Sequence, residues 1–334
     1  MKAIQLTKFG PDNTVLSELD QPEPGPSQVL VKLHAASINY RDFMIAQGFY
    51  RPDLPLPIIP LSDGAGEVVA LGDGVDRVKV GDRVTPTFFP KWISGDGSRA
   101  EKGVSTGCEM PGTLAEYGIF DQDALCTFPD FLSFEEAACF PCAGLTAWAA
   151  LAVSNIKAGD TILAMGTGGV ALFAIQFAKA LGANAIVISS SDDKIAQAKD
   201  LGASHGVNYK TTPEWADAIL ELTDGRGVDS VMELGGAGTL PQSLKAIRIG
   251  GHVPMMGNLA GIRIDMDIFP ILVKNAHIHG ITVGNRDTYE KMWDCVGTSE
   301  IRPVIYKTYD FENGGHAIQD IAAGRHFGKL TVKF

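Results

Sequence analysis

The chain has 334 residues, which is enough for two domains that each bury a core of their own. Hydrophobic residues make up 45% and charged residues 20%, as in water-soluble globular proteins, and the net charge of −11 argues against nucleic acid and anionic membranes as partners. The five cysteines lack paired close spacing, which predicts reduced thiols in a cytoplasmic protein. No apolar run approaches the ~20 residues that are needed to cross a bilayer.

Residues 1–125 predict a mostly β domain. They are rich in β-branched residues, glycine and proline, and two apolar runs at 29–35 and 66–71 are typical of strands. Helical patterns are scarce until Ser133, which stands three residues before Glu136. The two residues form a capping box and predict the start of an alanine-rich helix.

From residue 159 the chain alternates apolar strands with helical stretches. Strands are expected at 161–165, 185–189, 230–234, 252–256 and 277–283, with helices at 172–181, 194–201, 213–223, 240–247 and 268–275. This alternation predicts an α/β fold in which helices cover both faces of a doubly wound parallel sheet. The residues after 284 show only one helical piece, at 288–296, and a closing strand at 329–334. We therefore predict a catalytic and substrate domain of residues 1–125 with 285–334, and a dinucleotide-binding domain of residues 126–284.

The strand expected at 161–165 runs directly into a glycine-rich turn and an apolar helix. The turn and the start of the helix consist of Gly166, Thr167, Gly168, Gly169 and Val170. Small residues let the N–H groups at a helix N-terminus approach a pyrophosphate, whose charge the helix dipole stabilises. The third position of the fingerprint is Ala171 instead of glycine, and an ordinary strand-to-helix turn is the alternative. The order of the elements favours a nicotinamide dinucleotide site and hydride transfer.

Several segments in this order resemble the medium-chain dehydrogenase/reductase superfamily. The stretches at 64–69 (GAGEVV) and 78–84 (VKVGDRV) resemble its core β-domain signature, and those at 143–148 (AGLTAW) and 223–229 (TDGRGVD) resemble segments that enter and continue its cofactor domain. The resemblance covers essentially the whole chain and implies a GroES-like catalytic domain with a Rossmann cofactor domain. It also implies a homodimer joined through the edge strand at 277–283. The lysine that closes over the cofactor would be Lys329, for which a solvated surface lysine is the alternative.

The positions that bind catalytic zinc in alcohol dehydrogenases of this superfamily carry other residues here. The resemblance places Asn39 at the first ligand position, Ser62 and Asp63 at a His-Glu pair, and only Cys142 at a cysteine position. One thiolate, a hydroxyl and a carboxamide do not make a tetrahedral zinc site, so no metal is expected and Cys142 is interpreted as a buried packing residue. The segment 39–42 (NYRD), together with Tyr50, instead resembles the zinc-independent quinone oxidoreductases and related enoyl reductases.

In that branch Asn39 and Tyr50 would line the nicotinamide side of the cleft. Without a metal, reduction of an activated alkene or a quinone is less demanding than oxidation of an alcohol, because the developing charge lies on a conjugated oxygen. The Asn39 carboxamide and the Tyr50 hydroxyl are the predicted stabilising dipoles, and Tyr50 or water would supply the proton. Asp63 is a candidate for proton transfer or for shaping the site, while Asp42 could pair with Arg41 or hold its loop.

The end of the second strand of the cofactor domain selects between the two nicotinamide cofactors. An acidic residue there accepts bonds from the ribose hydroxyls of NAD, but this strand ends in serines. Ser189 stands where that acid would be, and the hydroxyls of Ser189 and Ser190 can donate to a 2′-phosphate. Lys194 and Tyr209 match positions that hold this phosphate in NADPH-dependent relatives, so the sequence predicts NADPH. The acids Asp192 and Asp193 oppose that prediction or simply stabilise the first turn of a helix. Further cofactor contacts, or ordinary turn residues, are Thr146, Gly257, Asn258, Thr282 and Val283.

Three functions remain open at this point. The leading hypothesis is an NADPH-dependent, zinc-free oxidoreductase that transfers a hydride to a small-molecule quinone or α,β-unsaturated carbonyl compound. The second is a metal-independent alcohol dehydrogenase or carbonyl reductase that uses Asp63, Ser62 or Tyr50 as the acid. The third belongs to another class, namely a protein that binds NADPH without physiological turnover.

Overall fold

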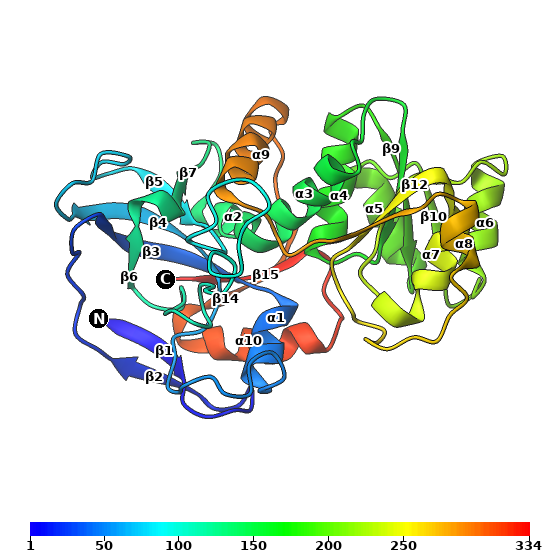
Figure 1. Ribbon diagram of the computed structural model, residues 1–334. Coiled ribbons are helices and arrows are strands. Elements are labelled where there is room, and N and C mark those ends of the chain that lie inside the picture. Colours follow the sequence, from blue (N-terminus) through cyan, green and yellow to red (C-terminus); the bar gives the residue numbers. More distant parts are fainter. The chain divides into compact units, whose positions relative to one another are not determined.

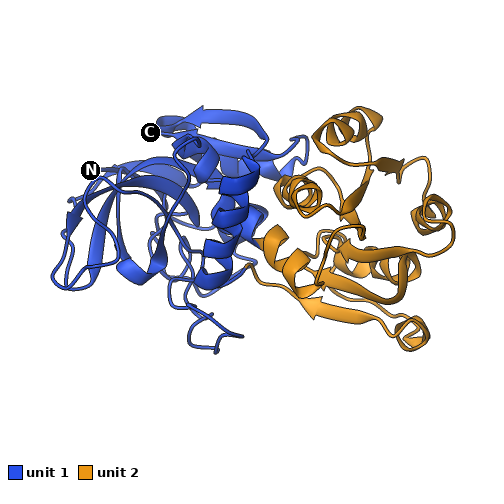
Figure 2. Ribbon diagram, turned by 90° about the horizontal axis from the view of Figure 1, so that it is seen from above, with its two compact units in different colours: residues 1–145, 284–334 blue, residues 146–283 orange.

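The computed structural model describes all 334 residues, and the chain divides into two compact units (Figure 2). The first unit consists of residues Met1–Leu145 and Gly284–Phe334, and the second of Thr146–Val283. The first unit extends past the boundary predicted at residue 125, because α2 (Phe134–Ala137) packs on β3 (Gln28–Ile38) and β4 (Asp63–Leu71). The chain returns to the first unit at residue 284, where the prediction placed residue 285.

Two sheets form the β part of the first unit. An antiparallel pair is made by β1 (Lys2–Leu6) and β2 (Thr14–Glu18). The larger sheet has seven strands in the order β14 (Ile305–Asp310), β15 (Lys329–Lys333), β3, β4, β5 (Arg83–Pro86) and β7 (Leu125–Thr127), with β6 (Tyr117–Asp121) paired to β3. Because β15 pairs with β3, the two separate chain segments of this unit build one sheet (Figure 1).

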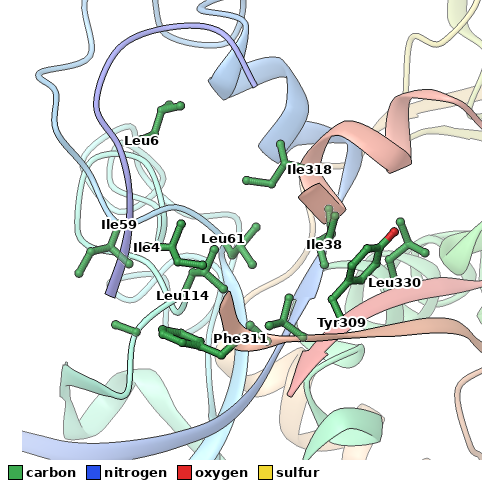
Figure 3. Close-up of a cluster of buried hydrophobic side chains, with 14 of the residues drawn as sticks. Ile4, Leu6, Ile38, Ile59, Leu61, Leu114, Tyr309, Phe311, Ile318 and Leu330 are labelled. Atoms are coloured by element: carbon green, nitrogen blue, oxygen red, sulfur yellow. The ribbon is translucent and has the colours of Figure 1, made fainter. Parts of the chain in front are cut away.

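Apolar side chains from both segments also share a core. Ile4 and Leu6 of β1, Leu330 of β15 and Ile318 of α10 (Gly314–Ala322) belong to one buried cluster (Figure 3). Neither α10 nor the short α1 (Tyr40–Ala46) is predicted from the sequence. The sequence does not predict α10 because this helix begins with two glycines, which are poor helix formers. A Cβ atom at Gly315 would lie 2.1 Å from the Oγ1 atom of Thr14, so close packing requires glycine there.

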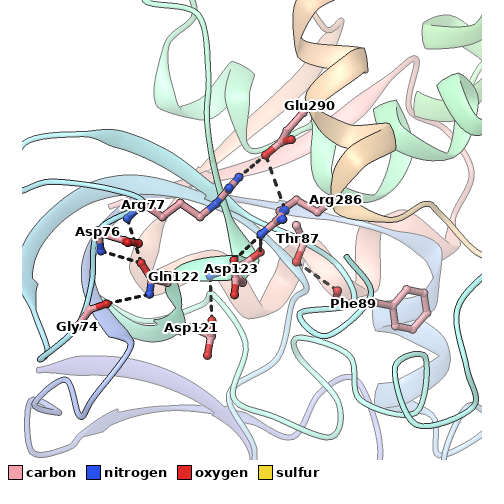
Figure 4. A network of polar contacts seen from close by, with 10 residues as sticks. All are labelled: Gly74, Asp76, Arg77, Thr87, Phe89, Asp121, Gln122, Asp123, Arg286 and Glu290. Carbon is pink, nitrogen blue, oxygen red and sulfur yellow. Dashed lines mark hydrogen bonds and ion pairs between the residues drawn. The ribbon is translucent and has the colours of Figure 1, made fainter. Parts of the chain in front are cut away.

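The helix that follows the return to the first unit is fastened to the β part by ion pairs. This helix, α9 (Arg286–Ser299), is longer than the stretch predicted at 288–296, because Asn285 caps its N-terminus and accepts the N–H of Thr288. The Arg286 Nη1 atom lies 2.6 Å from Asp123 Oδ1, and Glu290 pairs with Arg77 (Figure 4). These contacts explain why α9 belongs to the first unit although it follows the second in the chain.

A six-stranded parallel sheet forms the second unit and confirms the predicted α/β class. Its strand order is β10 (His205–Asn208), β9 (Asn184–Ser189), β8 (Thr161–Met165), β11 (Val228–Met232), β12 (Ile247–Met255) and β13 (His277–Gly280). The helices are α3 (Leu145–Val153), α4 (Gly169–Ala180), α5 (Asp192–Leu201), α6 (Trp215–Leu222), α7 (Leu240–Ala246) and α8 (Phe269–Val273). Since α4 contacts α5 and α6 contacts α7, right-handed crossovers place the two pairs on opposite faces of the sheet (Figure 1). The strand order reverses at β8, which is the point where open α/β sheets bind ligands.

Two differences from the predicted elements concern the ends of this sheet. The edge strand β10 is missing from the prediction, because its four residues include Gly206 and make no apolar run. The opposite edge strand β13 ends at Gly280, so Thr282 and Val283 lie in the connection after it and not in a strand running to residue 283.

The expectation that no apolar run approaches the length needed to cross a bilayer is wrong. The helical run Phe134–Val153 has 20 residues and a mean hydropathy of 1.4 in its most apolar window, which is long and apolar enough to cross a bilayer. Within the structure 67% of that window is buried, as in the core helices of globular proteins.

Candidate functional site

The glycine-rich turn lies where the sequence predicts it. Gly166 follows β8 with a left-handed φ of +75°, Thr167 is buried, Gly168 is the N-cap of α4, and Gly169 and Val170 are the first residues of that helix. No side chain caps this N-terminus, so its backbone N–H groups keep their capacity for an anionic ligand. A Cβ atom on Gly166 would meet no atom within 4 Å, so the turn borders open space. These features fit a dinucleotide pyrophosphate.

The end of β9 lies beside this turn, and the residues predicted to select NADPH gather there. Ser189 is the last residue of β9 and is 3% exposed, and Ser190 follows it. The N–H of Tyr209 donates to the carbonyl oxygen of Ser189 at 3.0 Å, while the Tyr209 ring is 41% exposed. Lys194 lies in the first turn of α5, and burial lowers the pKa of its ammonium group.

The two acids near this strand end belong to the first turn of α5. Asp192 and Asp193 follow the N-cap residue Ser191, whose hydroxyl accepts the N–H of Lys194 at 3.4 Å. The Asp192 carboxylate accepts a hydrogen bond of 2.9 Å from the amide of Asn208. The geometry therefore supports the interpretation that these acids stabilise the start of the helix.

The remaining predicted cofactor residues follow later strands or open the second unit. Gly257 and Asn258 come after β12, and Thr282 and Val283 after β13, at the carboxyl edge of the sheet. Val283 has a left-handed φ of +62°, which is strained for a β-branched residue and is typical of functional connections. Thr146 is the first residue of the second unit and is 5% exposed.

A buried carboxylate that sequence reasoning missed organises the turn after β11. Glu233 is fully buried, and its Oε1 atom accepts the N–H groups of Gly235 and Gly236, each at 2.8 Å, and the hydroxyl of Thr239 at 2.5 Å. Its Oε2 atom accepts the hydroxyl of Ser243. The only signal in the sequence is an acid two residues before a pair of glycines, at the end of an apolar strand.

In the first unit Asn39 and Lys329 form a buried polar pair. The Nζ atom of Lys329 lies 2.6 Å from Asn39 Oδ1 and 2.8 Å from the carbonyl oxygen of Ile38, and Lys329 is 4% exposed. The register of β15 on β3 pairs Leu330 with Ile38 and so brings the lysine to the end of β3. An ammonium group only donates, so the amide oxygen of Asn39 must face it. The Nδ2 atom of Asn39 is buried and has no hydrogen-bond partner.

Asp42 holds the loop that presents Asn39. Its Oδ2 atom accepts the N–H of Asn39 at 2.7 Å, its Oδ1 atom is buried without a partner, and burial raises the pKa of Asp42 to about 6. The alternative pairing with Arg41 is not found, because Arg41 donates to the carbonyl oxygen of Thr106 at 2.9 Å and to the hydroxyl of Ser105 at 2.8 Å.

The structure does not bring Tyr50 to the Asn39 amide. The Tyr50 side chain is 47% exposed, and its ring lies 5.1 Å from the guanidinium carbon of Arg41, which also stacks on Phe88 at 4.4 Å. No hydrogen bond joins the Tyr50 hydroxyl to Asn39 or Asp63. A role for Tyr50 at the reacting oxygen therefore stays a prediction.

The residues at the zinc positions do not fit a zinc ion. Asp63 is fully buried, and its two oxygens accept the hydroxyl of Ser62 at 2.7 Å and the N–H of Cys142 at 3.1 Å. Cys142 is half-buried, not fully buried as expected, and desolvation raises the pKa of its thiol. The Lys329 ammonium on Asn39 would repel a cation, and no group of three His, Cys, Asp or Glu side chains is arranged to hold one.

Comparisons with known proteins agree with both units. The alcohol dehydrogenase GroES-like domain family matches residues 25–130, and the zinc-binding dehydrogenase family matches residues 169–298. A zinc-type alcohol dehydrogenase-like protein of Schizosaccharomyces pombe is 41% identical over 315 residues, which cover 92% of this chain and 91% of that protein.

Solved structures show the same fold over the whole chain. A candidate alcohol dehydrogenase from Sinorhizobium meliloti 1021 superposes with a TM-score of 0.94 at 37% identity, covering 100% of this chain and 98% of that one. A quinone oxidoreductase from Pseudomonas syringae superposes with a TM-score of 0.82 at 29% identity, with coverage of 100% and 99%. The chain belongs to the medium-chain dehydrogenase/reductase superfamily and is an NAD(P)H-dependent oxidoreductase.

Proposed function

We propose that the protein is an NADPH-dependent, zinc-independent reductase of quinones or α,β-unsaturated carbonyl compounds. One observation carries this proposal: the Nδ2 atom of Asn39 is a buried donor without a partner, next to a buried ammonium group. A buried donor of this kind costs about 1–3 kcal/mol unless a ligand satisfies it. The oxygen of a conjugated carbonyl group is an acceptor that meets the requirement.

The second unit would hold the cofactor through the turn at Gly166–Val170 and the strand ends around it. When bound, NADPH supplies a hydride from C4 of its nicotinamide ring. The N–H groups at the start of α4 would bind the pyrophosphate, and Lys329 of the first unit would close over the cofactor. The rest of the cofactor would be lined by Thr146, Gly257, Asn258, Thr282 and Val283. In the first unit Asn39 would orient the substrate oxygen, Asp63 would shape the site, and Tyr50 or water would supply the proton.

The proposed preference for NADPH depends on Ser189, Ser190, Lys194 and Tyr209. Hydroxyl and ammonium groups donate to a 2′-phosphate, and the carboxylate of Asp192 already accepts a hydrogen bond from Asn208. Two charge-assisted hydrogen bonds of ~1.5–3 kcal/mol each would favour NADPH by about a hundredfold or more. Comparing the dissociation constants of NADPH and NADH tests this, and equal or tighter NADH binding would contradict it.

The reaction class is tested by substrate panel and by mutation. Enones, quinones, aldehydes and secondary alcohols are assayed side by side, with Asn39→Ala and Tyr50→Phe as variants. The proposal expects the highest kcat/KM with enones or quinones and a loss of at least tenfold in Asn39→Ala. Because relatives are named alcohol dehydrogenases, carbonyl reduction is the second candidate, and it wins if aldehydes are reduced faster. NADPH binding without oxidation of the cofactor by any compound of the panel would support a non-catalytic role.

We further propose that the protein is a cytoplasmic homodimer joined along β13. This strand is an edge of the second unit's sheet, and Ile278 on it is 38% exposed. Beside it in the chain, Phe269, Leu272 and Val273 of α8 are 61%, 64% and 52% exposed. An open edge strand with exposed apolar neighbours is typical of a protein–protein interface. Light scattering should give twice the mass of one chain, and Ile278→Lys should yield monomers.

A further inference from the structure

The guanidinium group of Arg41 is withdrawn from solvent without an ion-pair partner. Arg41 is half-buried, and its guanidinium group lies against the rings of Phe88 at 4.4 Å and Tyr50 at 5.1 Å. Its hydrogen bonds go to neutral oxygens, the carbonyl of Thr106 at 2.9 Å and the hydroxyl of Ser105 at 2.8 Å. Withdrawing a charge from water without an opposite charge is costly, so its retention here calls for an explanation.

One donor of this group has no acceptor within the protein. The Nε atom of Arg41 is buried and has no hydrogen-bond partner. The carboxylate of Asp42 does not bind it, since one oxygen accepts the N–H of Asn39 and the other is itself buried without a partner. Glu109, which accepts the hydroxyl of Ser105, is paired with Arg51 at 3.0 Å. No carboxylate of the chain therefore uses the Arg41 charge.

Arg41 lies at the same site as Asn39. Asn39 is the N-cap of α1, and Arg41 is in the first turn of that helix. Burial and the charge of Asp63 raise the pKa of the Cys142 thiol, while the charges of Lys329 and Arg41 oppose that shift, so Arg41 is close to this thiol. The Nδ2 atom of Asn39 is the second buried donor without a partner in this short segment. Two unused donors on one turn indicate a ligand with two acceptor groups.

The shape of a guanidinium group selects the kind of acceptor. The Nε–H and the second N–H of Nη2 can donate in parallel to the two oxygens of one carboxylate. Both faces of the group in Arg41 are in contact with aromatic rings, so a ligand meets its edge, where these N–H groups lie. A neutral carbonyl oxygen would satisfy only one donor and would leave the charge unpaired.

We propose that Arg41 is a specificity-determining residue that binds a carboxylate on the substrate, so that the enzyme reduces conjugated carbonyl compounds that carry a carboxylate group. The inference rests on the proposed function and names its substrate class. Asn39 donates to the conjugated carbonyl oxygen, and Arg41 holds the carboxylate of the same molecule. A substrate fixed at both ends presents its electron-poor carbon in one orientation.

A matched pair of enones tests the substrate class. The acid is trans-3-benzoylacrylic acid, and its methyl ester has the same conjugated ketone without the charge. With NADPH the natural protein is expected to show a kcat/KM at least tenfold higher for the acid. Arg41→Met is expected to lower kcat/KM for the acid by about 10–100-fold, which is the effect of losing charge-assisted hydrogen bonds, and to change that for the ester by less than about threefold.

Two further variants separate recognition from loop anchoring. Arg99→Met removes an exposed arginine that lies between Phe88 and Ser105 in the chain, and it should leave the ratio of acid to ester unchanged. Arg41→Lys keeps the charge but cannot donate in parallel, so it should lower the ratio by about threefold or more. This variant keeps the test valid if Arg41→Met does not fold.

A binding measurement makes the test independent of turnover. The saturated compound 3-benzoylpropionate keeps the ketone and the carboxylate but has no alkene to reduce. In calorimetry with NADP⁺ bound, the natural protein should bind this acid at least tenfold more tightly than its methyl ester. Arg41→Met should remove that difference.

The outcomes distinguish this inference from the proposed function. The carboxylate site is refuted if the natural protein prefers neither acid over its ester, or if Arg41→Met weakens acid and ester equally, as expected of a residue that only anchors residues 105–106. Reduction of neutral enones or quinones without any preference for a carboxylate would support the proposed function and refute this inference. A carboxylate preference in binding that depends on Arg41, in a protein that reduces no enone or quinone, would support the inference about binding and refute the proposed function.

Discussion

The buried Glu233 carboxylate allows a quantitative prediction about the second unit. In Glu233→Ala four donors lose their acceptor. The hydroxyls of Thr239 and Ser243 keep alternatives, since they also lie 3.3 and 3.2 Å from backbone carbonyl oxygens. The N–H groups of Gly235 and Gly236 have no other partner. Two unsatisfied buried donors at about 1–3 kcal/mol each predict a loss of roughly 4 kcal/mol in the free energy of unfolding.

Glu233→Gln is the matched variant that separates the acceptor from its charge. Its remaining amide oxygen still accepts the two glycine N–H groups, and the Ser243 hydroxyl can turn to accept from the new amide. The expected loss is therefore about 1 kcal/mol. Glu221→Ala removes an exposed carboxylate in the same unit and should change stability by less than about 0.5 kcal/mol.

Urea unfolding followed by circular dichroism at constant temperature measures these differences. The reasoning is refuted if Glu233→Ala loses less than about 1 kcal/mol, because the two N–H groups would then have found other partners. It is equally refuted if Glu233→Gln loses as much as Glu233→Ala, since the acceptor geometry would then not be what stabilises the turn. NADPH affinity measured in parallel shows whether the Gly235–Gly236 turn also supports the cofactor.

Three further predictions concern glycine geometry and pH. Gly166 and Gly159 both have a positive φ and open space for a Cβ atom, so Gly166→Ala and Gly159→Ala should each lower the free energy of unfolding by about 1 kcal/mol. Only Gly166→Ala should raise the NADPH dissociation constant, by tenfold or more. Equal effects of the two variants on NADPH binding would contradict the placement of the pyrophosphate at the Gly166 turn. Burial raises the pKa of Asp42 from 3.8 to about 6, so the folded state binds the proton more tightly than the unfolded state. The free energy of unfolding should therefore fall by about 2 kcal/mol as pH rises from 4 to 6; Asp42→Asn should abolish this slope, and an unchanged slope would refute it. Burial opposes ionisation of Asp229, but hydrogen bonds from two arginines lower its pKa to about 2. Its contribution to the free energy of unfolding is therefore present above about pH 4 and is lost as pH falls through about 2. In urea unfolding at about pH 7, Asp229→Asn should lower this free energy by about 2 kcal/mol, whereas Asp217→Asn, in an exposed ion pair, should lower it by less than about 1 kcal/mol.

The second unit was more accessible to sequence reasoning than the first. Its strands at β8 and β9 are continuous apolar runs that alternate with amphipathic helices, and such periodicity is local. The edge strand β10 has no such run, and its pairing with β9 depends on the rest of the sheet. Glycines at the start of α10 hide a helix that Thr14 and the core determine through packing.

The candidate site could be predicted only in part, because its residues meet through long-range pairing. The positions of Asn39 and Asp63 followed from a resemblance, whereas the sequence left two roles open for Asp42, and only the structure shows that it accepts the N–H of Asn39. The contact between Lys329 and Asn39 joins residues 290 positions apart and depends on the register of β15 against β3. A shift of one residue in that register would turn the lysine to the other face of the sheet.

The interior position of β15 has a consequence for how the protein is made. Residues 329–333 leave the ribosome after every other strand of their sheet, yet they lie between β14 and β3. During synthesis the parallel-sheet unit can therefore close while the other unit still presents an unpaired inner edge, which is prone to association with other chains. Loss of residues 329–333 would therefore leave the larger sheet of the first unit open between β14 and β3.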